Sequence, residues 1–595
     1  MKNPKKPTPQ QQAKVVDLGG LVVIQACPGS GKTFAVAARV ARMLRPWGEG
    51  RRNGMAILSF TNVAWRQIHK ELTESFGIQE GLHYPHFLGT IDSFVNRYIF
   101  LPFGHFVMGC ARRPELVGEP FGTWHAGGYH AQQFTNLRYD INGQLKVVDK
   151  RALKHGQAGI TQQLEQTKRR LNRAGFATQI DADYFAMRVI QNYPVIAKAL
   201  ARRFTVVMVD EAQDSSDIQM QILDLLVEHG IEDMLLIGDP DQAIFEWRDA
   251  KPELLAKKSE LDSWKEKAGC LTDNRRSSQH ICDFTWKLTG RSGPPPCAVN
   301  ENNAVRDCTA CPEIWGYDEK VDCQSIVTRF LELCRKHGIE PNRNSVAVLA
   351  RSRNLLKRIV GISAIQRGTE PWGDPITGEL LHIKALAEGD RYPEAWKRAR
   401  RILATIHLGK TNVSGAEIRQ VEQERGLVEL RKLTHELVTA LPAVGGSLEQ
   451  WCTAANPKWE GFCRSCKAPA PAIPLVPKQR KAHRDVDLTT VISPEELPLT
   501  QAEYRLGTVH SVKGETLEAV LLFLGKKTAR GKQYRTLLID GTTTLEEEEF
   551  RIPYVAMTRP RRILVLAVPH NDVDEWRKRL VPGEPEAPPT TSDRQ

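Results

Sequence analysis

The chain has 595 residues, too many for a single hydrophobic core, so several domains are expected. Hydrophobic residues make up 41% of it, and no apolar run approaches the roughly 20 residues that a membrane span requires. Lys and Arg number 82 against 70 Asp and Glu, and the net charge of +12 favours a polyanionic partner over a merely basic surface. The polar N-terminus lacks the apolar stretch of a secretory signal, so a cytoplasmic protein is expected.

A phosphate-binding motif is predicted at residues 21–33. Leu21 to Ile24 is an apolar, largely β-branched run typical of a buried parallel strand, and a helix is predicted from Thr33. The glycines between them let backbone N–H groups turn towards phosphate oxygens, at the positive end of the new helix. Lys32 would reach the β- and γ-phosphates, and the Thr33 hydroxyl would bind Mg²⁺. The residues expected to bind the nucleotide are Gly29, Ser30, Gly31, Lys32 and Thr33, and the alternative is an ordinary glycine turn.

Three more side chains are predicted to lie near this motif. Gln11 precedes the first strand by one short helix, and its amide can read the edge of an adenine. Residues 55–60 read as a second buried strand, followed by Asn62. Side chains just past the carboxyl ends of parallel strands face the ligand crevice of an open sheet, so Phe60 and Asn62 are placed to meet a substrate. The alternative is that both only cap the next helix.

Residues 101–203 differ in composition, with frequent Gly, His and Arg and helical patterns at 161–173 and 182–203. Within them, residues 168–173 form a strongly basic run. We interpret this interval as an inserted helical subdomain with one side towards a polyanion, although a solvated face accounts equally well for the run.

The sheet is predicted to resume at residues 205–209 and to end in Asp210 and Glu211. Two carboxylates at the end of a buried strand are costly unless a cation is present. Asp210 is therefore expected to hold Mg²⁺, directly or through its ligands. Glu211 is expected to orient the attacking water and to take its proton.

Residues 234–239 form a further predicted strand. Gln242 follows it, where it could sense the γ-phosphate. Trp247 and Arg248 come next, and an aromatic side chain beside an arginine suits base stacking together with a phosphate contact. Core packing is the alternative for Trp247.

Residues 209–214 and 238–248 resemble motifs II and III of the UvrD/Rep/PcrA helicases of superfamily 1. Further segments match this family in the same order, at Gln11 and at residues 60–62, 89–93, 271–277, 504–514 and 550–559. The resemblance implies that Arg276 and Arg559 reach the γ-phosphate and that Arg351 contacts DNA. It also implies that Thr508, His510 and Lys513 couple nucleotide to DNA. Arg275 stands where the family has an aromatic residue that stacks on adenine, and a guanidinium can also stack. The family usually has Gly-Leu-Glu where this chain has Gly514-Glu515-Thr516, so Glu515 is not given the family role.

The implied fold class is α/β, with two RecA-like P-loop domains built of parallel sheets and flanking helices, each carrying a mainly helical insertion. The first domain comprises residues 1–100 and 204–275, with the insertion at 101–203. The second comprises 276–360 and 501–570, with an insertion at 361–500 that ends in a Pro- and Lys-rich linker or loop at 467–484. Residues 571–595 are a C-terminal tail whose end is expected to be disordered.

The resemblance implies an ATP- and Mg²⁺-dependent 3′–5′ DNA helicase or translocase that acts on single-stranded and tailed duplex DNA. We expect it to be nucleoid-associated and to work in repair or recombination. One alternative is a translocase that drives a partner nuclease in a phage-defence or mobile-element system. Another is a nucleotide-gated DNA-binding switch with little turnover, against which Glu211 and the two arginines argue. No nuclease domain is expected after the last motif.

Two cysteine pairs, Cys308 with Cys311 and Cys463 with Cys466, have the spacing of metal ligands. Together they could form a structural four-thiolate zinc site. The alternative is that these thiols are unpaired and inert, because a cytoplasmic protein keeps its cysteines reduced.

Overall fold

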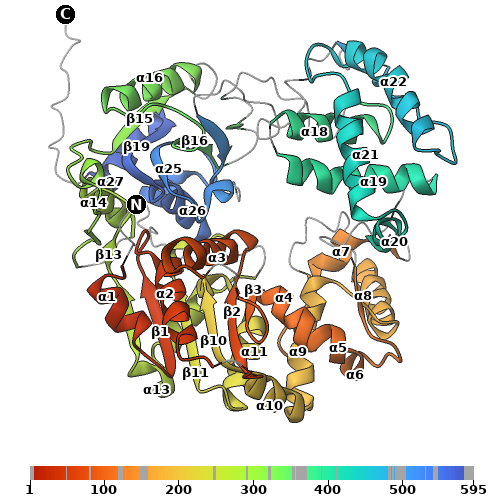
Figure 1. Cartoon of the computed structure of the whole chain (residues 1–595). Helices are drawn as coiled ribbons and strands as arrows, with labels where there is room; N and C mark the ends of the chain where they lie inside the picture. Colours follow the sequence, from red (N-terminus) through yellow and green to blue (C-terminus); the bar gives the residue numbers. More distant parts are fainter. Residues whose placement is uncertain are drawn as a thin grey trace, which may run out of the picture.

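The computed structural model describes residues 6–48, 50–78, 82–117, 125–126, 129–147, 158–245, 249–289, 293–318, 323–351, 355–356, 359, 371–389, 391–409, 413, 415–479, 484–485, 488, 504–528, 531–539 and 547–581. Figure 1 shows two lobes that each contain a sheet, and two groups of helices, one beside each lobe. Among the described residues, no helix is both long enough and apolar enough to cross a bilayer.

The first lobe is built on a six-stranded sheet with the order β12-β1-β11-β10-β2-β3. Its strands are β1 (Leu21–Ala26), β2 (Gly54–Ser59), β3 (Phe87–Thr90), β10 (Phe204–Asp210), β11 (Asp233–Gly238) and β12 (Ala268–Leu271). Every neighbouring pair is parallel. The strands are continuous apolar runs because helices cover both faces of the sheet, and their carboxyl ends meet at one edge.

Helices on the two faces complete this lobe. One face is covered by α2 (Lys32–Leu44) and α3 (Asn62–Phe76), and the other by α9 (Gln179–Asn192), α10 (Pro194–Arg203) and α11 (Asp217–Glu228). The sequence marks their starts, since Thr61 caps α3 and Ser216 forms a capping box at α11. Shorter helices, α12 (Pro252–Lys258) and α13 (Asp262–Lys265), lead to the edge strand β12.

The second lobe has a five-stranded parallel sheet with the order β15-β19-β18-β16-β17. Its strands are β15 (Glu313–Tyr317), β16 (Val346–Ala350), β17 (Arg505–Thr508), β18 (Leu517–Phe523) and β19 (Pro560–Pro569). One face packs on α16 (Cys323–Lys336), and the other on α14 (Gln279–Thr289), α25 (Tyr534–Ile539), α26 (Glu548–Met557) and α27 (Val573–Leu580). The prediction of parallel sheets with flanking helices is confirmed.

The first insertion contains the short strands β7 (Leu137–Tyr139) and β8 (Leu145–Val147) and the helix α8 (Ala158–Arg173). The basic run in α8 is divided between core and surface. Lys168 is 2% exposed and pairs at 2.7 Å with Asp181, which is equally buried, whereas Arg169, Arg170 and Arg173 are exposed. Part of the predicted polyanion-facing run is therefore a buried ion pair.

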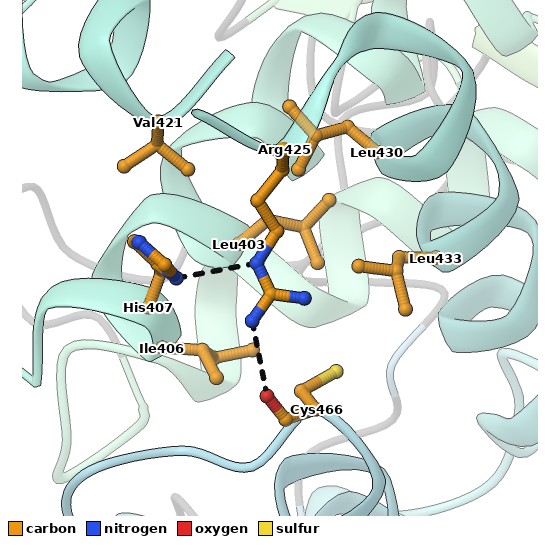
Figure 2. A pocket seen from close by; sticks show the side chains of 8 residues that line it. All are labelled: Leu403, Ile406, His407, Val421, Arg425, Leu430, Leu433 and Cys466. Carbon is orange, nitrogen blue, oxygen red and sulfur yellow. Dashed lines mark hydrogen bonds between the residues drawn. The ribbon is translucent and has the colours of Figure 1, made fainter. Parts of the chain in front are cut away.

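The second insertion is a helical group with its own core, beside the second lobe in Figure 1. It contains α18 (Thr377–Glu388), α19 (Tyr392–Leu408), α20 (Gly415–Arg425), α21 (Leu427–Ala440) and α22 (Leu448–Ser465). Figure 2 shows Arg425, the last residue of α20, donating hydrogen bonds to His407 Nδ1 (3.2 Å) and to the carbonyl of Cys466 (3.3 Å). The cavity around Arg425 is only about 10 Å³, so this cluster joins α19, α20 and α22 and has no room for a ligand.

The Pro- and Lys-rich stretch after α22 is hydrogen-bonded to that helix at residues 473 and 475. The indole of Trp459 donates to the carbonyl of Ile473 at 3.0 Å, and the amide of Asn456 makes two hydrogen bonds with the backbone of Leu475. Leu475 itself is buried. The prediction of a free linker or mobile loop is wrong for this part, because apolar side chains between the prolines pack into the core of the insertion.

Candidate nucleotide and nucleic-acid site

The phosphate-binding loop lies between β1 and α2 and needs its glycines. Gly29 and Gly31 have φ angles of 75° and 72°, in the left-handed region that side chains disfavour. A Cβ atom on Gly29 would lie 2.6 Å from Asn274 Oδ1, and one on Gly31 would lie 2.8 Å from Gln11 Nε2. The loop is therefore held tightly against its neighbours, at the N-terminus of α2, where backbone N–H groups are available to an anion.

Gln11 lies against this loop. Its side chain is buried, and its Nε2 donates to the carbonyl of Ser30 at 2.7 Å. Phe34, which sequence reasoning did not single out, lines the same cleft, and the guanidinium of Arg275 lies 5.6 Å from its ring centroid. A planar cation and an aromatic ring beside Gln11 form a surface that suits a purine base. The signal in the sequence was an aromatic residue directly after the Lys-Thr pair.

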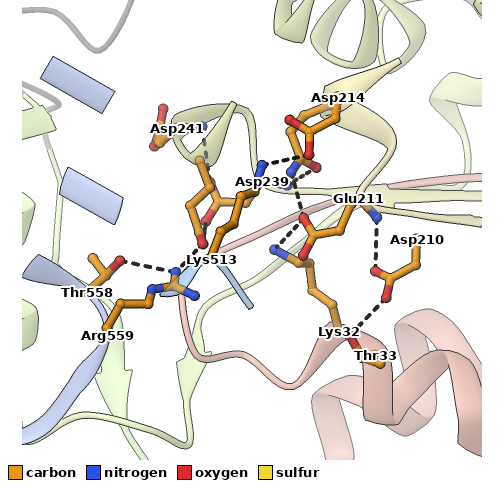
Figure 3. A network of polar contacts seen from close by, with 12 residues as sticks. Lys32, Thr33, Asp210, Glu211, Asp214, Asp239, Asp241, Lys513, Thr558 and Arg559 are labelled. Atoms are coloured by element: carbon orange, nitrogen blue, oxygen red, sulfur yellow. Dashed lines mark hydrogen bonds and ion pairs between the residues drawn. The ribbon is translucent and has the colours of Figure 1, made fainter. Parts of the chain in front are cut away.

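Polar and charged side chains at the carboxyl edge of the first sheet are joined by hydrogen bonds and ion pairs (Figure 3). Thr33 Oγ1 donates to Asp210 Oδ2 at 2.8 Å, and Lys32 Nζ lies 3.7 Å from Glu211 Oε2. Gln213 donates a further hydrogen bond to Glu211 at 2.6 Å. Glu211 has a φ of 58°, and a residue other than glycine in this region costs about 1–3 kcal/mol. The structure thus places the proposed water-activating carboxylate in a strained position beside the loop lysine.

The pKa values of these groups follow from burial and from each other's charge. Burial alone would lower the pKa of Lys32, but the neighbouring carboxylates, Glu211 first, outweigh it and raise the pKa. Burial acts to raise the pKa of Glu211, yet Lys32 and Lys513 hold it below its usual range. The pKa of Asp210 is raised, by burial and then by the charge of Glu211. Glu211 is therefore ionised at neutral pH, as a proton acceptor must be.

A cleft of about 650 Å³ separates the two lobes and is lined by both. The first lobe contributes the phosphate-binding loop, Glu211 and Gln242, and the second contributes Arg276 and Arg559. Arg559 is buried, and its guanidinium donates to Gln242 Oε1, which links the lobes directly. The structure therefore brings all four predicted catalytic side chains to one cleft.

The side chains in this cleft are suited to bind Mg²⁺ and a nucleoside triphosphate. Ser30 Oγ is buried in the loop and has no hydrogen-bond partner among the described residues, which leaves it free for a phosphate oxygen. Thr33 and Asp210 offer adjacent hydroxyl and carboxylate oxygens, the ligands that Mg²⁺ prefers. Lys32, Arg276 and Arg559 supply positive charge around them.

The predicted DNA-contacting residues are only partly gathered in one place. Phe60, at the end of β2, is buried against Phe245, with ring centroids 5.3 Å apart, and His510 lies 6.2 Å from the same ring. Lys513 lies 4.4 Å from the centroid of Phe245 and pairs at 2.6 Å with buried Asp214 of the first lobe. Phe245 and Asp214, which were missed as site residues, are thus the centres around which the two lobes meet.

The remaining predicted DNA contacts lie elsewhere. Asn62 is exposed at the start of α3, where its Oδ1 accepts a hydrogen bond from the indole of Trp65 at 3.0 Å. Arg351 is mostly buried and pairs at 3.3 Å with Glu549 on α26, so in this arrangement its charge is already neutralised. Trp247 and Arg248 lie outside the described residues.

The proposed zinc site is not formed. Cys463 and Cys466 are buried in the core of the second insertion, whereas Cys308 and Cys311 lie beside the second sheet, near Arg562 and His280. Across the part of the chain that is described, no group of three or more His, Cys, Asp or Glu side chains is placed to hold a metal ion. The four-thiolate hypothesis is wrong because the two pairs belong to different cores.

Residues 7–106 and 128–261 match the family model of the UvrD/REP helicase N-terminal domain. The chain carries a UvrD/REP helicase N-terminal domain. The matched residues include the phosphate-binding loop and the carboxyl edge of the first sheet, and the gap between them falls in the first insertion. The match thus covers the strands and helices that position Lys32, Asp210 and Glu211, together with part of the first insertion.

Curated relatives match this chain over part of its length. The ATP-dependent DNA helicase UvrD1 of Mycobacterium tuberculosis (strain ATCC 25618 / H37Rv) is 26% identical over 376 residues, which are 58% of this chain and 47% of UvrD1. UvrD1 of Mycobacterium bovis matches to the same extent. The exonuclease/helicase protein RexA of Streptococcus pneumoniae serotype 4 (strain ATCC BAA-334 / TIGR4) is 27% identical over 168 residues, 26% of this chain and 13% of RexA. The match therefore spans about half the length of UvrD1, and the homology is distant.

Proposed function

We propose that this protein is an ATP-driven motor that moves 3′ to 5′ along single-stranded DNA and unwinds tailed duplexes, in DNA repair or recombination. The observation that carries the proposal is the single cleft lined by the phosphate-binding loop of one lobe and by Arg276 and Arg559 of the other. The nucleotide site in this cleft is complete only when both lobes contribute side chains to it. Binding and release of the nucleotide therefore control how the lobes sit against each other.

The residues of the cleft divide the chemistry of hydrolysis between them. Glu211 takes a proton from water as the water oxygen attacks the γ-phosphorus, and the bond to the β-phosphate oxygen breaks, giving ADP and phosphate. Lys32 and the two arginines oppose the negative charge that spreads over the transferring group. An arginine in this role is worth about 10³- to 10⁵-fold in rate. Thr33 and Asp210 would hold Mg²⁺, which would supply further positive charge beside the phosphates.

Movement on DNA follows from contacts that cross the cleft. Gln242, which touches Arg559, lies three residues before Phe245, whose ring meets His510 and Lys513. Loss of the γ-phosphate removes the ligand that Arg559 and Gln242 share. A resulting shift of Gln242 moves Phe245, which contacts His510 and Lys513 of the second lobe. The choice of DNA rather than RNA is supported by the relatives named DNA helicases, and the 3′ to 5′ direction rests on the resemblance of the motifs to the UvrD/Rep/PcrA helicases.

The test is steady-state ATP hydrolysis with and without single-stranded DNA, followed by unwinding of duplexes with a 3′ or a 5′ tail. We expect hydrolysis to be stimulated by single-stranded DNA, and unwinding of the 3′-tailed duplex only. Absence of hydrolysis under both conditions would overturn the motor, and unwinding of the 5′-tailed duplex alone would overturn the direction.

A second candidate is a motor that drives a partner nuclease in a phage-defence or mobile-element system. The match to the exonuclease/helicase protein RexA over 168 residues favours it. This alternative expects DNA-stimulated hydrolysis and translocation with poor unwinding until a partner nuclease is added. Strong unwinding by the isolated chain would exclude it.

A further inference from the structure

The guanidinium of Arg276 is held in the cleft by two oxygen atoms of its own lobe. Its Nε donates to Thr516 Oγ1 at 3.0 Å, and its Nη1 donates to the carbonyl of Thr558 at 3.1 Å. Neither acceptor carries a charge. Within the described residues, no carboxylate forms an ion pair with Arg276, and its Nη2 has no hydrogen-bond partner. The side chain is thus directed by neutral groups, with one amino group left for a ligand.

The surroundings of Arg276 make its positive charge costly. Enclosure among protein atoms, and then the charges of Arg559 and Arg561, lower the pKa of this guanidinium well below its usual value. A guanidinium stays protonated nonetheless, so an anion that enters the cleft relieves the repulsion. A carboxylate at the position of Thr516 would offset the same charge in advance and would leave less of it for a phosphate.

The residue before Thr516, Glu515, carries a carboxylate, but this carboxylate does not pair with Arg276. Glu515 pairs with Nη1 of Arg505, whose Nη2 donates to the carbonyl of Ser511 at 2.9 Å. Arg505 starts β17, whereas Thr516 directly precedes β18. Glu515 is therefore neutralised by Arg505 of β17, and the hydroxyl of Thr516 is the group that accepts a hydrogen bond from Arg276.

We propose that Thr516 is a positioning residue that aims Arg276 at the γ-phosphate without neutralising its charge. The proposal rests on the proposed function, because it assigns the role of one side chain in the same hydrolysis reaction. Thr516 is exposed on the cleft surface, so its substitution leaves the core of the lobe intact. The hydrogen bond has its effect when the arginine must hold one orientation against the transferring phosphate.

The experiment compares Thr516→Val, Thr516→Ser and wild type in DNA-stimulated ATP hydrolysis. Thr516→Val keeps the shape but removes the acceptor, and we expect kcat to fall about tenfold while KM and the Kd for a fluorescent ATP analogue change less than twofold. Thr516→Ser restores the hydroxyl and should restore kcat. The matched control is Thr439→Val, an exposed threonine on α21 whose hydroxyl donates only to the carbonyl of His435. A Thr516→Val enzyme with unchanged kcat, or a Ser variant as slow as the Val variant, would overturn the proposal.

A double-mutant cycle with Arg276→Ala shows whether Thr516 acts through the arginine. We expect Thr516→Val to slow the Arg276→Ala enzyme by less than twofold, because the group that it orients is gone. Losses that multiply in the double variant would overturn the proposal. Failure of the proposed function itself has a different signature, since the wild-type chain would then hydrolyse no ATP in the first measurement.

Discussion

The two lobes hold their charged groups at the cleft in opposite ways. In the first lobe, Lys32 faces Glu211 and Thr33 is bonded to Asp210, so charges and polar groups are matched before a nucleotide is present. In the second lobe, Arg276 and Arg559 lie beside each other, and neither has a carboxylate partner among the described residues. The difference supports the proposal that the first lobe binds the nucleotide, whereas the second stabilises the negative charge that develops during the reaction.

The same contrast extends to the insertions. Residues 101–178, which precede α9, contain 11 Lys and Arg against 5 Asp and Glu, whereas residues 361–500 contain 19 against 17. Half of the net charge of +12 thus belongs to the insertion of the binding lobe. A basic surface there suits a nucleic-acid backbone, whereas the second insertion balances its charges internally.

The largest effect is expected from the arginines of the second lobe. Arg559→Ala should lower kcat of DNA-stimulated hydrolysis by about 10³- to 10⁵-fold, because it removes charge needed only in the transition state. Equilibrium binding of ATP, which the first lobe provides, should weaken far less. The control is Arg577→Ala, an exposed arginine on α27. Equal losses in binding and in kcat would contradict the division between the lobes.

Glu211→Gln should come next, with a loss of about 10²- to 10⁴-fold in hydrolysis, since the amide cannot accept a proton from water. Lys32 loses its counter-charge in this variant, so the affinity for ATP should be kept or increased. Stopped-flow binding and steady-state hydrolysis measure the two effects separately. Unchanged turnover would reject Glu211 as the base.

The ion pair between Lys513 and Asp214 should show a smaller effect. The two residues belong to different lobes. Removing the charge of one partner leaves the other buried and unpaired, which costs about 3–5 kcal/mol. Lys513→Met should lower DNA-stimulated turnover and the stability of the closed arrangement. The double variant Lys513→Met with Asp214→Asn should recover part of the loss, as judged by turnover and by denaturant unfolding. Strictly additive losses would show that the two side chains act independently.

The smallest effect is expected from the exposed arginines of α8. Replacing Arg169, Arg170 and Arg173 by Ala should weaken DNA binding and make its dependence on salt less steep, by about 0.7–0.9 in slope for each phosphate that is no longer bound. The kcat at saturating DNA should not change. Ala in place of Lys397, Lys458 and Arg464, three exposed cationic side chains of the second insertion, is the matched control. An equal change in salt dependence in the control variant would contradict the proposal that the first insertion, and not the second, binds the DNA backbone.

The sequence alone determined the parts of the site that are local. A strand, a loop with two glycines and a helix are consecutive from Leu21 to Leu44, so the positions of Lys32 and Thr33 follow from backbone preferences. The carboxylates at the end of β10 were predictable for the same reason. Whatever depends on neighbours in sequence could be inferred without a structure.

Only the tertiary structure decided which distant residues meet. Arg559 and Gln242 are 317 positions apart, and Lys513 and Asp214 are 299 apart. No pattern of spacing could show that Arg351 pairs with Glu549, or that the two cysteine pairs belong to separate cores. The physical reason is that the packing of whole lobes and insertions sets these contacts, whereas local propensity sets only the elements that carry them.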